Sequence, residues 1–344
     1  MAQTAAPDRR HAYRVEDSPA RVVRDGGTRV DVTADQLRIL QGMALATLSL
    51  DPGAAREPHW HPNAAELSYC AEGSAQFTVV EPGGRPVVFA VEEGDVVFVP
   101  TGFLHGIENT SDREARFLIC FSHERYEDLN LSTSLTNMPP SVLDATFGVA
   151  PGSFDWARPL PEPAFIASPR TTAPTREHVA SPYRYQLERL QPQVQNEGGW
   201  IRFARGDDHP ILNGLSMYSL WFNDAGVREP HWHPNCAELN YLLTGRVRVT
   251  IVSPAGEVET FELSAGEISY IPPAYFHHIE SLVEEVAHMC VFFNHEMPGD
   301  NGIAAAVSAC SSELMGEVFG QPAEVFRSLP SFADDVLLAP PSGA

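Results

Sequence analysis

The chain has 344 residues, of which 43% are hydrophobic and 20% charged, so it is long enough for two ordinary domains and too apolar for a disordered protein. Its 45 acidic and 23 basic residues give a formal net charge of −22, which argues against nucleic acid and anionic membranes as partners. The basic residues are all arginine, which excludes Schiff-base chemistry, attachment of pyridoxal phosphate and the lysine of a phosphate-binding loop.

The N-terminal segment, residues 1–21, is polar and charged and contains no apolar stretch of signal-peptide length. No segment approaches the run of apolar residues that spans a bilayer, so we expect a cytoplasmic protein that does not bind membranes. The five cysteines form no C-x-x-C pair, which favours buried free thiols over a disulfide scaffold or a thiolate zinc site.

Short strand-like segments follow the N-terminal segment, separated by Gly, Pro, Asp and Asn. Runs such as ATLSL, ELSYCAEG and ARFLICF alternate between apolar and polar residues or stay apolar over strand length. This pattern predicts an all-β fold, an antiparallel sandwich or barrel. Residues 129–148, LNLSTSLTNMPPSVLDATFG, then predict a short helical segment after the strands.

Four side chains among these strands form a candidate metal site. His59 and His61 lie two residues apart, so on a strand both imidazoles project from one face. Glu66 begins the next predicted strand, and His105 arrives on a later one. Three imidazoles and one carboxylate suit Mn, Fe, Co, Ni, Cu or Zn, and they leave two positions of an octahedral ion open for chemistry.

Arg56 precedes this group by three residues. Strand parity alone places its side chain on the face opposite His59, unless a bulge or a strand end near Pro58 turns it inward.

A Pro-rich stretch separates two predicted domains. Such a composition does not build a packed element, so residues 159–181 are predicted to be a linker. It divides a first domain, residues 1–158, from a second, residues 182–344.

The second domain repeats the first. The segment REPHWHPNAAELSY at residues 56–69 recurs as REPHWHPNCAELNY at residues 228–241. Each position lies 172 residues before its counterpart, as Arg56 does before Arg228, and this offset continues through His105 and His277. The repeat predicts a second helical segment at residues 302–320 and a second set of metal ligands, His231, His233, Glu238 and His277. The neighbouring His278 points to the opposite face of its strand.

The spacing of these residues resembles the two sequence motifs of the cupin family. The first copy carries both motifs complete: Gly53-x5-His59-x-His61-x4-Glu66-x6-Gly73 and Gly94-x5-Pro100-x-Gly102-x2-His105-x3-Asn109. The second copy keeps the ligands but has Ala225, Ala274 and Ser281 at framework positions. Over residues 12–330 the chain resembles the two-domain oxalate decarboxylases of this family.

This resemblance implies a fold, cofactors and an activity. The expected fold is two cupin barrels in tandem, of the double-stranded β-helix or jelly-roll type, each followed by a short helical segment. The expected cofactors are one Mn²⁺ per domain and dioxygen. The expected reaction splits oxalate, a small carboxylate, into formate and carbon dioxide, in a homo-oligomer that is a trimer or a hexamer.

The resemblance also implies roles for side chains beside the metal. The arginine at the position of Arg56 binds the substrate carboxylate, and Arg228 occupies the matching place in the second copy. An acidic residue in a short loop that covers the site, here called the lid acid, delivers the proton that decarboxylation consumes. Glu127 and Asp128 are the candidates in this chain. Leu67 follows the ligand glutamate where the decarboxylases tend to carry tryptophan, which predicts a reshaped pocket.

Two alternatives stay open. The site could instead belong to an oxalate oxidase, or to another metal-dependent oxygenase acting on a larger acid. A non-catalytic, storage-like bicupin is the second alternative, although storage-type barrels commonly lack the ligands that both copies retain here.

Overall fold

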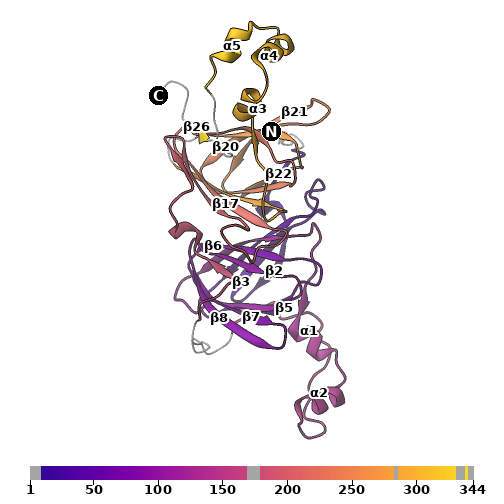
Figure 1. Ribbon diagram of the computed structural model, residues 1–344. Helices are drawn as coiled ribbons and strands as arrows, with labels where there is room; N and C mark the ends of the chain where they lie inside the picture. Colours follow the sequence, from indigo (N-terminus) through magenta and orange to yellow (C-terminus); the bar gives the residue numbers. More distant parts are fainter. Residues whose placement is uncertain (1–8, 169–178, 283–285, 331–337, 340–344) are drawn as a thin grey trace, which may run out of the picture. The chain divides into compact units, whose positions relative to one another are not determined.

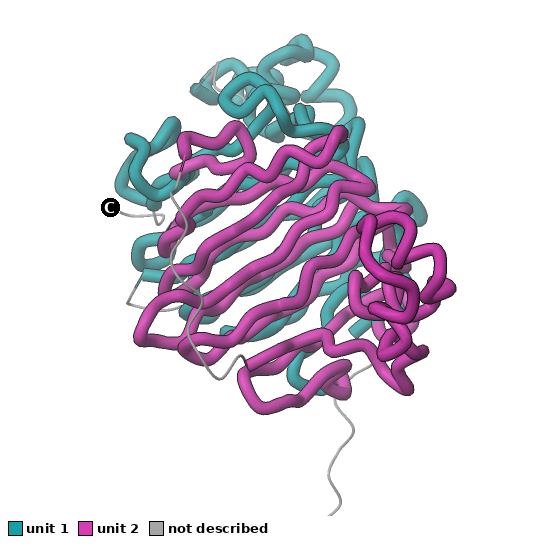
Figure 2. The backbone as a smooth tube through the Cα atoms, turned by 90° about the horizontal axis from the view of Figure 1, so that it is seen from below, with its two compact units in different colours: residues 1–17, 37–42, 187–344 teal, residues 18–36, 43–186 magenta. Residues whose placement is uncertain are grey.

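The computed structural model describes residues 9–168, 179–282, 286–330 and 338–339 (Figure 1). The chain forms two compact units (Figure 2). Ser18–Gln36 and Met43–Gln186 make up one, here called the first barrel; Met1–Asp17, Leu37–Gly42 and Leu187–Ala344 make up the other, the second barrel. Strands dominate both, which confirms the all-β prediction.

Two antiparallel sheets build the first barrel. One has the order β14 (Arg184–Tyr185), β9 (Val96–Val99), β6 (Glu66–Glu72), β11 (Ala115–Phe121), β4 (Ala44–Leu50), β3 (Gly27–Val32) and β2 (Ala20–Arg24). The other has the order β12 (Leu129–Asn130), β5 (Ala55–Trp60), β10 (Leu104–Glu108), β7 (Ser74–Glu81) and β8 (Arg85–Glu92), with β13 (Ile166–Ala167) also paired to β5.

The second barrel repeats this arrangement. Its larger sheet has the order β1 (Ala12–Arg14), β22 (Glu267–Ile271), β19 (Glu238–Thr244), β24 (Ala287–Phe293), β17 (Ser216–Phe222), β16 (Gly199–Ala204) and β15 (Val194–Asn196). Its smaller sheet has the order β21 (Val258–Ser264), β20 (Arg246–Val252), β23 (Phe276–Ser281), β18 (Val227–Trp232) and β25 (Asn301–Gly302), with β26 (Leu338–Ala339) paired to β18. The short 3-10 turns are η1 (Val15–Asp17) and η2 (Leu187–Arg189).

Alternating side chains explain why these segments form strands around a core. On β20, Val247, Val249 and Ile251 are buried while the residues between them are partly exposed. β-Branched residues at every second position fit one face of a pleated strand. The same residues belong to the hydrophobic cluster inside the second barrel, so this face fills the barrel interior.

Short helices follow the strands of each barrel, as predicted (Figure 1). They are α1 (Leu131–Thr136), α2 (Pro140–Phe147), α3 (Ile303–Ser308), α4 (Ser312–Phe319) and α5 (Ala323–Arg327). Helix α2 begins with proline at its first turn and ends at Gly148, which has a φ of 64°, so the local sequence sets both ends. Among the helices that the structure describes, none combines the length and apolarity needed to cross a membrane.

Two alanines adopt the left-handed conformation that the motif glycines take in the first barrel. Ala225 has a φ of 48° and Ala274 a φ of 62°, against 76° for Gly53 and 79° for Gly102. The Ala274 backbone N–H donates to the His233 carbonyl at 2.9 Å, as the Gly102 N–H does to the carbonyl of His61. The turns that support the ligands therefore keep their shape despite the missing glycines.

The compact units divide the chain differently from the predicted domains. Strand β1 precedes the first barrel in sequence but pairs with β22 of the second, and β14 pairs with β9 of the first.

The predicted linker also contains structure. Composition suggested that residues 159–181 form no packed element, yet β13 at Ile166–Ala167 pairs with β5, and Phe165 is buried. Strand β26 pairs with β18 just as β13 pairs with β5, with each residue 172 positions later in the chain. The duplication therefore extends to the end of the described chain. Backbone pairing with the edge of β5 outweighs the Pro-rich composition here. Residues 169–178 of this stretch lie outside the described residues.

Candidate metal centres

A β-bulge brings the Arg56 side chain to the same face of β5 as the His59 side chain. His59 pairs with His105, whereas Arg56 pairs with Ile107, so three steps along β5 match two steps along β10. The extra residue on β5 reverses the strand parity, which turns the Arg56 side chain into the barrel. Strand β18 has the same irregularity between Arg228 and His231. Of the two orientations left open by the sequence, the inward one is therefore present in both barrels.

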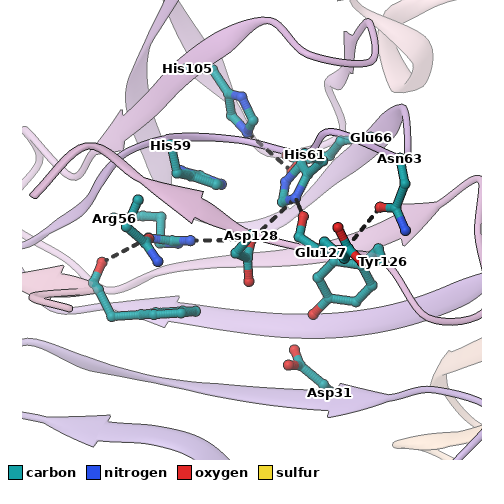
Figure 3. Close-up of polar contacts among 12 residues, drawn as sticks. Asp31, Arg56, His59, His61, Asn63, Glu66, His105, Tyr126, Glu127 and Asp128 are labelled. Carbon is teal, nitrogen blue, oxygen red and sulfur yellow. Dashed lines mark hydrogen bonds and ion pairs between the residues drawn. The ribbon is translucent and has the colours of Figure 1, made fainter. Parts of the chain in front are cut away.

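The predicted ligands converge in each barrel. One donor atom from each of His59, His61, Glu66 and His105 lies within 4.8 Å of the others, and all four residues are buried. The same description fits the group formed by His231, His233, Glu238 and His277. Figure 3 shows the three imidazoles of the first barrel near Glu66, with Arg56 and Asp128 beside them.

Backbone carbonyls orient all three imidazoles of the first barrel. The Nδ1 atoms of His59, His61 and His105 lie 2.8, 2.9 and 2.9 Å from the carbonyl oxygens of Glu57, Glu127 and Phe103. A neutral imidazole that donates its Nδ1–H to a carbonyl keeps a bare lone pair on Nε2. The three Nε2 lone pairs are therefore available for a shared ligand.

The Nε2 atoms face a carboxylate, so in this tautomer a cation between them would bind lone pairs from both sides. Glu66 Oε2 lies 3.0 Å from Nε2 of His61 and 3.2 Å from Nε2 of His105. Nε2 of His59 is buried and has no hydrogen-bond partner among the residues that the structure describes. Lone pairs from three nitrogens and one carboxylate oxygen match the donor set of a divalent transition-metal ion.

The second barrel has the same orientation of ligands. The Nδ1 atoms of His231, His233 and His277 lie 2.7, 2.7 and 2.9 Å from the carbonyl oxygens of Glu229, Gly299 and Tyr275. Glu238 Oε2 lies 2.9 Å from Nε2 of His233 and 3.3 Å from Nε2 of His277.

Electrostatics keep His59 and Glu66 in the protonation states that a metal requires. Burial opposes protonation of His61, but hydrogen bonds to Asp128 and Glu66 raise its pKa above the ordinary value. Burial, reinforced by Arg56, holds the pKa of His59 well below its ordinary value, so the imidazole stays neutral. Burial opposes ionisation of Glu66, but His105 and His61 hold the pKa of its carboxyl well below the usual range. The corresponding pKa values of His231 and Glu238 shift in the same directions.

Arg56 is a fully enclosed cation beside the ligands of the first barrel. Its side chain is only 1% exposed, and its guanidinium stacks 3.8 Å from the ring centre of Phe165. Nη1 donates to the Asn130 side-chain oxygen at 2.7 Å and to the Phe165 carbonyl at 3.3 Å. Burial, aided by the nearby Arg29, lowers the pKa of Arg56 to about 10, which reflects the cost of holding this charge away from water.

Asp128 lies between the metal ligands and several arginines. Its Oδ1 is 3.1 Å from Nδ1 of His61 and 3.4 Å from Nη2 of Arg56, and its Oδ2 is 2.6 Å from Nη1 of Arg21. Burial alone would raise the pKa of Asp128, but Arg29, His61 and Arg56 together hold it below its usual range. Asp128 therefore rests as a carboxylate.

The two candidates for the lid acid are placed differently. The Asp128 side chain lies within the group, whereas Glu127 is exposed and contributes its backbone carbonyl to His61 (Figure 3).

A second buried arginine extends the polar group in the first barrel only. Arg29 on β3 donates to the Tyr126 hydroxyl at 2.6 Å and to Asp31 at 2.9 Å. We call Arg21, Arg29, Arg56, Asp31 and Asp128 the arginine cluster; its three arginines outnumber its two aspartates by one charge. At the equivalent positions of the second barrel, Ile201 stands in place of Arg29 and Phe203 in place of Asp31, so both charges are replaced by apolar side chains.

Apolar side chains predominate around a small cavity at the second site, and Arg205 lies close to Tyr218 in its wall. A cavity of about 10 Å³ beside its ligands is lined by Arg228 and by Ile201, Tyr218, Leu220, Ile279, Val291 and Phe293. Arg228 is 4% exposed and forms a close ion pair with Asp300.

Several residues at these sites escaped the sequence analysis. The 172-residue offset takes Asp128 to Asp300, so the repeat alone could have identified that aspartate. Arg21 and Arg29 belong to no motif and have no charged counterpart in the second copy. Phe165 lay in the predicted linker.

Leu67 does not reshape the metal pocket as expected. On β6 the Ser68 hydroxyl donates to the Glu66 carboxylate at 2.7 Å, so residues 66 and 68 share the inner face. Leu67 lies between them and therefore points to the opposite face. Leu239 follows Glu238 in the same way, since the Asn240 side chain donates to Glu238 at 2.6 Å.

An open cleft adjoins the first site. It has a volume of about 690 Å³, and its lining includes Arg21, Asp128, Asn130 and Phe165. The last three also contact Arg56. They therefore form the wall between the cleft and the buried guanidinium.

The chain is similar to known proteins over both halves. The family described as cupin matches residues 15–153 and 185–325. Oxalate decarboxylase OxdC of Bacillus subtilis (strain 168) is 31% identical over 270 residues, covering 76% of this chain and 69% of that protein. A probable oxalate decarboxylase of Arthroderma benhamiae is 25% identical over 324 residues, covering 91% and 79%. A solved structure of Bacillus subtilis oxalate decarboxylase, studied for its Mn(II) centres, superposes with a TM-score of 0.85 at 26% identity, covering 95% of this chain and 88% of that one.

Proposed function

Because this chain belongs to the cupin family, with a cupin domain in each half, we propose that it is a metal-dependent carboxy-lyase of the oxalate decarboxylase type. The reaction converts oxalate and one proton into formate and carbon dioxide, with dioxygen required. The observation that carries this proposal is the enclosed Arg56 guanidinium beside a convergent group of three histidines and one glutamate. The guanidinium and a metal ion held by that group would be two cationic centres, and two such centres suit a small dicarboxylate.

We assign one divalent ion to each barrel. The ligands are His59, His61, Glu66 and His105 in the first, and His231, His233, Glu238 and His277 in the second. Manganese is the proposed ion, supported by the Mn(II) centres of the similar decarboxylase; Fe, Co, Ni, Cu and Zn accept the same donors. When bound, the ion supplies a Lewis-acidic centre with open positions.

The side chains of the first barrel bind the substrate and move its proton. Arg56 holds one carboxylate of oxalate through charge-assisted hydrogen bonds, while Asn130 and Phe165 fix the guanidinium in place. Asp128 is the acidic side chain beside both Arg56 and His61. As a resting carboxylate it accepts the proton of the monoprotonated acid and returns it to the carbon atom that loses carbon dioxide.

We place turnover in the first barrel. The arginine cluster there carries one more positive than negative charge, and an anionic substrate is attracted by that excess. In the second barrel Arg228 is already paired with Asp300, and apolar residues replace Arg29 and Asp31.

Product analysis of the metal-loaded protein tests the proposed reaction. Incubation with oxalate under air is expected to yield formate without hydrogen peroxide. Peroxide without formate would identify an oxalate oxidase instead. If the protein contains both metal ions and forms neither product, oxalate is not its substrate.

Removing the metal is expected to destabilise the fold, because the ion binds the native ligand set and not the unfolded chain. An ion present at about a thousand times its Kd contributes about 4 kcal/mol. A chelator should therefore lower Tm by about 10 °C for domains of this size, measured by differential scanning fluorimetry. The double variant H59A/H231A is the control, since its Tm should not respond to the chelator.

We further propose that the protein is a cytoplasmic homo-oligomer, a trimer or a hexamer, held together by its helical segments. Both segments expose large apolar side chains at repeat-related positions: Val142 is 50% and Phe147 59% exposed, and Leu314 is 52% and Phe319 59% exposed. Exposed apolar clusters of this kind typify association surfaces.

Charges placed on the helical segments should dissociate the oligomer. The double variant F147E/F319E is expected to elute near the mass of one chain, 37.7 kDa, in size-exclusion chromatography with light scattering. V258E is the matched control, because Val258 is 65% exposed but lies on β21, outside the helical segments. Equal masses for all three proteins would contradict the assignment of this surface.

A further inference from the structure

The two duplicated arginines have different relations to their neighbouring aspartates. Arg228 forms a close ion pair with Asp300 through Nη2. The corresponding pair in the first barrel is stretched, with 3.4 Å between Nη2 of Arg56 and Oδ1 of Asp128. The same pair of residue types therefore forms a close contact in one barrel and a loose one in the other.

Arg21 contacts the other oxygen of the Asp128 carboxylate. Its Nη1 lies 2.6 Å from Oδ2 of Asp128, the shortest ion-pair contact of that carboxylate. The repeat places Gln193 at the corresponding position, and the Gln193 side-chain oxygen accepts the backbone N–H of Phe203 at 3.1 Å. The second copy thus has no arginine at the position from which Arg21 attracts Asp128.

The loose contact leaves Arg56 able to bind another anion. Within the described part of the chain, Nε of Arg56 is buried and has no hydrogen-bond partner. A guanidinium whose carboxylate neighbour is held elsewhere keeps most of its attraction for a second carboxylate, since close ion pairs neutralise each other.

Arg21 also lies where an anion would arrive. Its side chain is 39% exposed and lines the cleft of about 690 Å³ together with Asp128 and Phe165.

We infer that Arg21 is a positioning residue that makes Arg56, and not Arg228, the arginine available to the substrate carboxylate, by holding Asp128 away from it. This inference rests on the proposed function, which assigns substrate binding to Arg56. Arg21 acts through Asp128 and touches neither the metal ligands nor the bound carboxylate.

The variant R21Q copies the second barrel and tests this role. Asp128 is expected to close onto Arg56, so KM for oxalate should rise at least about tenfold, and kcat should fall by a smaller factor because Asp128 also moves the proton. Metal content and Tm should match the wild type. A structural role would instead lower kcat, metal content and Tm together, and that outcome, or an unchanged KM, would overturn the inference.

Two further variants serve as controls. R21K retains a cation near Asp128, so its KM should lie within about threefold of the wild type. Q193R adds an arginine at the equivalent position of the second barrel and should leave KM unchanged. A rise in KM for Q193R equal to that of R21Q would contradict the proposed link to Asp128.

A double variant tests whether Asp128 is the intermediary. In R21Q/D128N the asparagine carries no charge to pair with Arg56 but keeps an oxygen for Nδ1 of His61. Oxalate binding to the manganese-loaded protein, measured by calorimetry without dioxygen, should return to within about threefold of wild-type affinity. Affinity as weak as that of R21Q would overturn the inference. Wild-type protein that binds no oxalate would instead refute the proposed function on which it rests.

Discussion

Replacing His59 with alanine is expected to halve the bound metal and to lower turnover of oxalate by roughly a thousandfold or more. The variant lacks one of four ligands, and a catalytic ion contributes several kcal/mol to transition-state stabilisation. Plasma mass spectrometry of the purified protein gives the metal content, and a formate assay gives the rate.

His231→Ala is the matched variant in the second barrel. It should also lose about half of the metal, because the two ligand sets have the same composition and burial. Most of the turnover should remain if the reaction takes place in the first barrel. Unchanged metal content in both variants would show that the ligand assignment is wrong, and equal loss of turnover would refute the choice of the first barrel.

Replacing Arg56 with glutamine is expected to lower kcat/KM for oxalate by roughly a hundredfold. Truncating one partner of a buried charge pair costs about 3 kcal/mol, and the glutamine cannot offer the paired donors of a guanidinium. Steady-state kinetics on metal-loaded protein measures the effect, and the metal content should stay the same because Arg56 is not a ligand.

Arg228→Gln provides the comparison for this experiment. Arg228 occupies the equivalent place after an equivalent bulge, but it is paired with Asp300. Its loss should change kcat/KM by less than about threefold. If the two variants lose activity equally, both barrels bind substrate and the arginine cluster does not distinguish them.

The repeat and the fold could be predicted because both depend on local patterns. Spacing of histidine and glutamate on strands fixes which side chains share a face, and a constant offset transfers the assignment from His59 to His231. In both barrels the side chains that converge are the ones that this spacing brings together.

Other parts of the site could not be predicted because they depend on contacts distant in sequence. The direction of Arg56 follows from a bulge that only the pairing of β5 with β10 reveals. Arg21 and Asp128 are more than a hundred residues apart, and no motif links them. Phe165 reaches Arg56 from a segment whose composition predicted a linker, because β13 adds to the edge of β5.

The exchange of strands β1 and β14 has a consequence for dividing this chain. A fragment cut within the Pro-rich stretch would take β1 away from β22 and leave β9 without β14, so each half would expose an unpaired sheet edge. Truncation at a boundary drawn from sequence motifs would therefore yield pieces prone to aggregation. Strand β1 is encoded in the first half of the gene but belongs to the second barrel, and β14 is encoded in the second half but belongs to the first barrel. A mutation in β1 would therefore weaken the second barrel, and a mutation in β14 would weaken the first.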